Sequence, residues 1–142
     1  MITTILKNEM DINYRSDIIP ETEAIIAVYD SSGINRPTYD KERIAKMYAS
    51  SNLVITAWDK DLLVGISRSL TDFCFSCYLS DLAIRKEYQK LGIGKKLINM
   101  TKEKIGEQCM LLLLSAPTAM EYYPKVGFDK VNNGFIINRS KP

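Results

Sequence analysis

Between about residues 75 and 115, an apolar strand, a glycine-containing turn, an amphipathic helix and a second apolar run follow one another. This order constrains the fold more than any other feature of the sequence. The segment FCFSCYLSDLAI is typical of a strand, and GIGKKLINMTKEKIGEQ places apolar residues on one helical face. The run CMLLLLSA is continuously apolar, which predicts a strand buried on both faces. A strand, helix and strand in this order predict a right-handed parallel crossover.

The other elements complete an α/β (α+β) pattern. Residues 2–15 predict an opening strand region, and residues 52–70 predict a hairpin split by Asp59-Lys60-Asp61. Further helices are predicted over 20–32, 40–51 and 118–126, and a final hairpin over 127–140. A chain of 142 residues suits one domain, so we predict a single domain over 1–142, with a mixed, mostly antiparallel sheet flanked by helices.

Composition excludes several kinds of chemistry. The sequence contains no histidine, which removes Ser-His-Asp and Cys-His catalysis and histidine-ligated metals. Cys74 and Cys77 have the CxxC spacing, but residues i and i+3 of a strand point to opposite faces and no second CxxC exists. We therefore expect free thiols and no metal. A net charge of +2 without a long basic run gives no reason to expect nucleic acid.

The stretch EYQKLGIGKKL concentrates glycine and positive charge where a helix begins. The first amides of a helix lack intrahelical partners, and glycine lets a ligand approach the backbone closely, so such a turn can bind phosphate. The spacing does not match a P-loop, and Leu97 stands where the dinucleotide fingerprint needs a small residue. From the glycines alone, an anion site and an ordinary loop with solvated lysines remain equally open.

The wider sequence resembles the GNAT superfamily of acetyl-CoA-dependent N-acetyltransferases. Residues 89–94, Gln-Lys-Leu-Gly-Ile-Gly, match the family signature Gln/Arg-x-x-Gly-x-Gly/Ala, and YYPKVGF at 122–128 is similar to a second family element. The order of elements also agrees over nearly the whole chain. One departure is that Ser115-Ala116-Pro117 stands where many members carry an asparagine that contacts CoA.

The resemblance implies acetyl-CoA as cosubstrate and assigns residues to it. Backbone at Leu82, Ala83 and Ile84 would pair with the pantetheine arm, in a cleft opened where this strand splays from the next. An amide near Leu82 would polarise the acetyl carbonyl. The CoA pyrophosphate would lie on the loop made of Gln89, Lys90, Leu91, Gly92, Ile93, Gly94 and Lys95.

The resemblance also assigns the proton donor. Tyr123 matches the family tyrosine that protonates the leaving thiolate, although an aromatic packing residue is the simpler alternative. For the base, Asp81 is the first candidate because it lies on the strand expected to face the acetyl group. Strand alternation leaves its direction open, since a bulge could turn it. Glu121 and Asp72 are weaker candidates for the base, and attack by an already neutral amine, through water, is the other alternative.

The expected activity is transfer of an acetyl group to a primary amine of a small molecule or peptide, by direct attack in a ternary complex. The alternative is a catalytically silent acyl-CoA-binding module that regulates a partner. Arg36, Tyr39 and Trp58 are candidates for contacts with the acceptor. The sequence shows neither a signal peptide nor an apolar run of the roughly 20 residues that span a bilayer, so we expect a cytoplasmic protein without membrane contact. Many members of the family dimerise, which makes a homodimer one expected state.

Overall fold

The computed structural model describes residues 11–142, so most of the predicted opening strand lies outside the described residues. The strands are β1 (Asn13–Arg15), β2 (Leu53–Asp59), β3 (Leu62–Thr71), β4 (Ser76–Ile84) and β5 (Met110–Leu112). The α-helices are α2 (Thr22–Ser32), α3 (Lys41–Ala49), α4 (Ile93–Ile105) and α5 (Tyr122–Lys125). Two short 3₁₀ helices are η1 (Lys86–Tyr88) and η2 (Pro117–Ala119).

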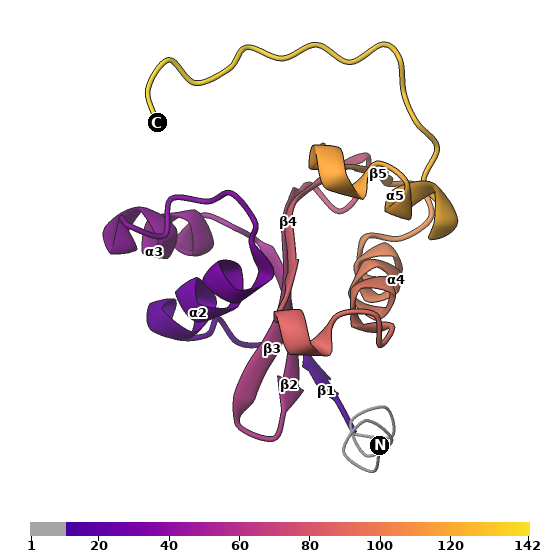
Figure 1. Ribbon diagram of the computed structural model, residues 1–142. Coiled ribbons are helices and arrows are strands. Elements are labelled where there is room, and N and C mark those ends of the chain that lie inside the picture. The colour runs from indigo at the N-terminus through magenta and orange to yellow at the C-terminus, as the bar shows by residue number, and fades with distance from the viewer. Residues whose placement is uncertain (1–10) are drawn as a thin grey trace. The chain divides into compact units, whose positions relative to one another are not determined.

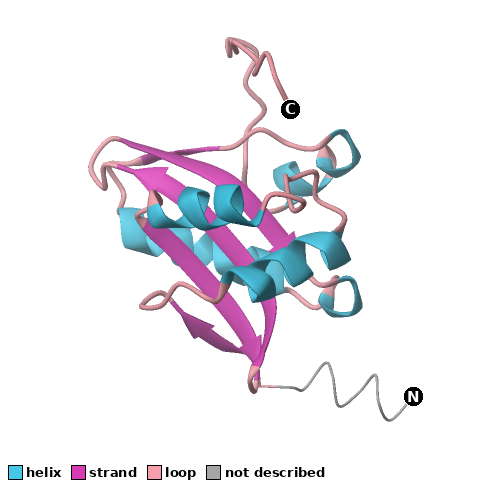
Figure 2. Ribbon diagram, turned by 90° about the vertical axis from the view of Figure 1, so that its left-hand side faces the viewer, coloured by secondary structure: helices cyan, strands magenta, loops and turns pink. Residues whose placement is uncertain are grey.

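The strands form one sheet in the order β1-β2-β3-β4-β5, which is the order of the sequence. Neighbouring strands are antiparallel except β4 and β5, which are parallel and joined through α4. Helices α2 and α3 cover one face of the sheet and α4 covers the other (Figures 1 and 2). The predicted mixed, mostly antiparallel sheet and its parallel crossover are therefore confirmed.

Local sequence signals place the end of α2 and the start of α3 where the sequence predicts. Gly33 closes α2 in the left-handed conformation, with φ of 82°, and its amide donates to the Tyr29 carbonyl at 3.1 Å. Asp40 caps α3, because its carboxylate accepts from the Arg43 amide at 3.1 Å. These two signals bracket the loop of residues 33–40, which joins the two helices on one face of the sheet.

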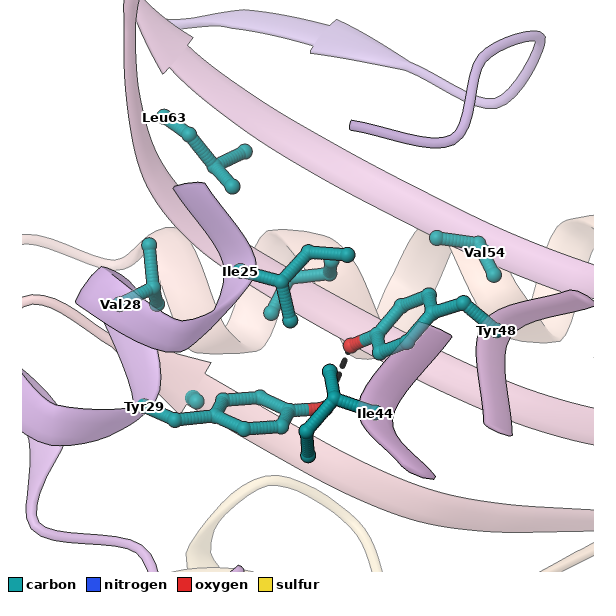
Figure 3. Close-up of a cluster of buried hydrophobic side chains, with 9 residues drawn as sticks. Ile25, Val28, Tyr29, Ile44, Tyr48, Val54 and Leu63 are labelled. Atoms are coloured by element: carbon teal, nitrogen blue, oxygen red, sulfur yellow. Dashed lines mark hydrogen bonds between the residues drawn. The ribbon is translucent and has the colours of Figure 1, made fainter. Parts of the chain in front are cut away.

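Each face of the sheet has its own hydrophobic core. On the α2/α3 face, side chains of both helices pack on β2, β3 and β4, and this cluster includes Ile25, Val28, Tyr29, Ile44, Tyr48, Val54 and Leu63 (Figure 3). On the other face, Ile93, Leu97 and Ile105 of α4 pack on residues of β2 and β3. The sheet is thus packed on both faces at β2 and β3.

The prediction for residues 109–116 is wrong in length and in burial. The strand covers only Met110–Leu112, and the side chain of Met110 is 53% exposed. The physical reason is its position at the edge of the described sheet, where β4 is its single neighbouring strand. An edge strand has no neighbouring strand on one side, so its side chains are covered less than those of a central strand, even when they are apolar.

The described residues divide into two compact units, residues 11–112 and 113–142. The second unit contains η2, α5 and a C-terminal segment that has no strand over residues 129–142. The predicted final hairpin is therefore wrong: Phe135 and Ile137 are fully exposed in an extended segment. A two-stranded hairpin is marginal without further strands or a helix to pack on. That all 142 residues form one domain stays a prediction.

Candidate active site

The glycine loop adopts a backbone that leaves helical amides free for a ligand. Lys90 and Gly92 both have left-handed backbones, with φ of 66° and 86°. Gly92 is the N-cap of α4, and it offers no side chain to the first-turn amides. A Cβ built at Gly92 would meet no other atom within 4 Å, so the space beside this glycine is open. The residues present fit the diphosphate that the sequence predicts here.

The segment that leads into this loop is anchored at several points. The Arg85 amide and guanidinium donate to the carbonyls of Val64 and Leu63 at 2.8 and 2.7 Å. The Lys86 amide donates to Ser31 Oγ of α2 at 3.0 Å. Tyr88 is buried and donates its hydroxyl to Asp59, and burial together with this hydrogen bond raises the pKa of Tyr88 to about 12. The loop therefore starts from a fixed point on the sheet.

One edge of β4 is open where the pantetheine arm is expected. Within the described sheet, β5 pairs only with Ser76–Tyr78, so the rest of β4 has no strand on that side. Because the Arg85 amide points toward β3, strand alternation turns the amides and carbonyls of Leu82 and Ile84 toward the open edge. The Ile84 carbonyl there accepts from Gln89 Nε2 at 3.0 Å. Ala83 instead lies in the α2/α3 core.

A β-bulge decides the direction of Asp81. Arg68 pairs with Asp81 and Ser69 with Leu79, which leaves Ser80 as the extra residue. Both Ser80 and Asp81 consequently face the α2/α3 side, where Arg68 donates to Ser80 Oγ at 2.9 Å and to Asp81 Oδ2 at 2.6 Å. The Asp81 side chain has no exposed surface.

The Asp81 carboxylate accepts four hydrogen bonds. Besides Arg68, its donors are Tyr29 Oη at 2.7 Å, Arg36 Nε at 2.5 Å and Ser80 Oγ at 3.3 Å. Burial alone would raise the pKa of Asp81, but the hydrogen bond and charge of Arg68, with the charge of Arg36, hold that pKa below its usual range. A carboxylate so stabilised is a weak base, and its role as the general base stays a prediction.

Two buried tyrosines extend this network. Tyr29 gives its only proton to Asp81, so in the hydrogen bond between the two hydroxyls Tyr48 is the donor (Figure 3). Burial raises the pKa of both phenols well above the usual value, and both are therefore neutral. Sequence reasoning missed Tyr29, Tyr48 and Arg68. The one available signal was an arginine and an aspartate in neighbouring apolar strands, and it depends on a register that the sequence does not reveal.

Tyr123 belongs to the second unit and is described there by itself. It lies in α5 with its ring edge-on to Tyr122 and to Phe128, at centroid distances of 5.2 and 5.5 Å. Its carbonyl accepts from the Phe128 amide at 3.1 Å. These contacts fix the ring on the turn that follows the helix.

Comparison with known protein families shows to which family the chain belongs. A family model described as an acetyltransferase (GNAT) domain matches residues 25–139. The chain belongs to the GNAT family. The resemblance seen in the sequence is confirmed, and the uncapped glycine loop and open strand edge described above lie within the matched region.

Curated relatives agree with this assignment. The chain is 30% identical over 110 residues to an uncharacterized N-acetyltransferase ycf52 of Pyropia yezoensis, and 28% identical over 111 residues to the ycf52 protein of Porphyra purpurea. Each match covers 74% of this chain but 63% of the relative. The chain thus spans less than two thirds of the length of these relatives.

Solved structures share the fold. The SA2161 protein of Staphylococcus aureus superimposes with a TM-score of 0.77 at 24% identity, covering 91% of this chain and 100% of that one. The PaiA N-acetyltransferase of Thermoplasma acidophilum, solved in complex with coenzyme A, gives 0.66 at 22% identity, covering 89% and 94%. Within residues 11–142, no helix is long and apolar enough to cross a membrane.

Proposed function

We propose that this chain transfers the acetyl group of acetyl-CoA to a primary amine of a small molecule or peptide. The observation that carries this proposal is the combination, in one crossover, of an uncapped helix N-terminus with an open strand edge. The first feature suits a diphosphate, and the second suits an amide-containing arm that pairs like a strand. A plain phosphate-binding loop would need the first feature but not the second.

In this proposal, backbone groups hold the cosubstrate. The amides from Gln89 to Lys95 bind the CoA pyrophosphate, and exposed Lys90 and Lys95 add long-range attraction. The outward carbonyl of Leu82 and the outward amide of Ile84 pair with the pantetheine arm. The Leu82 amide also donates to the acetyl carbonyl oxygen, whose negative charge grows as the amine attacks. Acetyl-CoA supplies the activated acyl group.

The chemical step is a direct transfer in a ternary complex. The amine nitrogen forms a bond to the acetyl carbon, the carbon–sulfur bond breaks, and the amine loses a proton to water. Tyr123 gives its phenolic proton to the departing sulfur, since a phenol of pKa near 10 suits a thiolate of pKa near 8.5, and the phenolate then regains a proton from water. Attack by an already neutral amine agrees with a chain that has no histidine and whose Asp81 is fully engaged.

The same two observations favour a second candidate, a silent module that binds acyl-CoA and regulates a partner. Such a module needs the glycine loop and the open edge of β4, but it needs no proton donor such as Tyr123. It predicts tight CoA binding without turnover for any amine.

Turnover separates the two candidates. The protein is incubated with acetyl-CoA and a panel of aliphatic, aromatic and peptide amines, and the acetylated amine is measured by mass spectrometry. This readout is preferable to thiol titration because the exposed thiol of Cys74 would also be titrated. We expect transfer to at least one amine class that rises with pH as the free amine fraction grows. CoA binding without transfer to any amine would support the silent module instead.

A further inference from the structure

The loop between α2 and α3 is tied to β4 through one side chain, Arg36. Its Nε donates to Asp81 Oδ1 at 2.5 Å and its Nη2 donates to the Ser80 carbonyl at 2.7 Å. The third guanidinium nitrogen, Nη1, donates to the carbonyl of the neighbouring Asn35 at 2.7 Å. Arg36 thus connects loop residues 33–40 to the bulge of β4, next to the strand positions proposed to bind the pantetheine arm.

The three charged side chains of this contact differ in how far they are exposed to solvent. The exposed fraction of the side chain is 0% for Asp81, 8% for Arg68 and 27% for Arg36. Arg68 fixes the carboxylate from the neighbouring strand, and it also donates to Ser51 Oγ at 3.0 Å, just beyond the end of α3. Asp81 therefore pairs with two arginines: Arg68, which is buried in the core, and Arg36, which belongs to the loop and is partly exposed.

We propose that Asp81 is a positioning residue, whose ion pair with Arg36 fixes the 33–40 loop on the β4 bulge and so shapes the acceptor side of the site. The inference rests on the proposed function, because it assumes that acetyl-CoA binds along β4. Two charge-assisted hydrogen bonds hold the loop more rigidly than a water-exposed contact could. A fixed loop lets the acceptor bind with less ordering cost, which lowers its KM.

This role differs from that of a general base in what it requires. A base must release its lone pairs to a proton during each turnover. A positioning carboxylate must remain ionised and keep its donors throughout. The bulge favours the second role, because it turns Ser80 and Asp81 together toward the two arginines.

Amide hydrogen exchange tests the positioning role without any substrate. Beyond the helix cap at Gly33, three amides of the loop are hydrogen-bonded: Ile34 to Ser32 Oγ, Thr38 to the Arg36 carbonyl, and Asp40 to the Pro37 carbonyl. In Arg36→Met we expect these amides to exchange about tenfold faster than in the wild type, because the loop opens locally. Lys41→Met is the matched control, since it removes an exposed ion pair with Glu23 beside the same loop. We expect no change there.

Kinetics then separate positioning from proton transfer. Arg36→Met should raise the acceptor KM about tenfold and leave the acetyl-CoA KM nearly unchanged. Asp81→Asn should do the same with a kcat within a few-fold of the wild type, whereas loss of a general base would lower kcat about 10²–10⁴-fold.

Unchanged exchange in Arg36→Met, or a kcat lowered about a hundredfold or more in Asp81→Asn, would overturn the inference. If Asp81→Asn does not fold, Arg36→Met decides alone. If the wild type acetylates no amine, the proposed function fails, while the exchange data still decide whether the ion pair fixes the loop.

Discussion

Replacing Asp81 by asparagine should destabilise the protein strongly at neutral pH. The amide has nearly the shape of the carboxylate, so the packing of the core is kept while the charge is lost. Two guanidiniums, Arg36 and Arg68, then remain beside a neutral group, and Arg68 is almost fully buried. Removing one partner of a buried ion pair typically costs about 3–5 kcal/mol.

The structure places the expected loss at the lower end of that range, about 3 kcal/mol, because Arg36 is partly exposed and can regain water. Against a total of about 5–15 kcal/mol for a native domain, this is a large fraction. Urea unfolding at pH 7, followed by circular dichroism, measures it as a shift of the midpoint at constant slope. Lys41→Met should differ from the wild type by less than about 1 kcal/mol, since its ion pair is exposed.

The loss of stability in Asp81→Asn should also depend on pH in a defined direction. The pKa of Asp81 is lower in the folded protein than in the unfolded chain, so the unfolded chain binds more protons as the pH falls below about 4. The stability that the carboxylate provides is therefore complete near neutral pH and is lost as the pH falls through the folded pKa. The difference between wild type and Asp81→Asn should shrink between pH 7 and about pH 3. A difference below about 1 kcal/mol at pH 7, or one independent of pH, would refute the reasoning.

Three further predictions concern other parts of the chain. A Cβ at Gly65 would lie 2.9 Å from Ile84 Cδ1 and 3.1 Å from Ile93 Cγ2, so Gly65→Val should lose about 1–3 kcal/mol in urea unfolding, and an unchanged midpoint would contradict this packing. Cys74 should react with a thiol reagent in the native protein while Cys77, 1% exposed, should not; stoichiometric zinc or a disulfide between them would contradict free thiols. Tyr123→Phe should lower the single-turnover rate about 10²–10⁴-fold with little change in the acetyl-CoA KM, and retention of more than about half the rate would make Tyr123 a packing residue.

Local signals predicted much of the fold. Gly33 and Asp40 act within one helical turn of their own position, so the end of α2 and the start of α3 could be predicted from the sequence. The left-handed Gly92 at the start of α4 follows from the same kind of signal. The predictions for residues 109–116 and 127–140 were wrong because an apolar pattern does not determine how many strands will pair with a segment.

The candidate site could be predicted only in part. The glycine loop is contiguous in sequence, and its pattern leads directly to its backbone. The Asp81 network joins five segments, and its members come together only through a bulge at Ser80 and the register between β3 and β4. A shift of one residue in that register would turn Arg68 to the opposite face, so no local pattern could reveal it.

Calorimetric titration of coenzyme A tests most directly whether the glycine loop at the start of α4 is the cosubstrate site. The variant is Gly94→Val, which adds a branched side chain in the first turn of α4 at a position without a left-handed backbone. Asn99→Val, on an exposed position of the same helix, controls for the helix propensity of valine. The account predicts that the wild type and Asn99→Val bind coenzyme A alike, while Gly94→Val binds at least about tenfold more weakly, a difference of about 1.4 kcal/mol. Unchanged affinity in a folded Gly94→Val protein would contradict it.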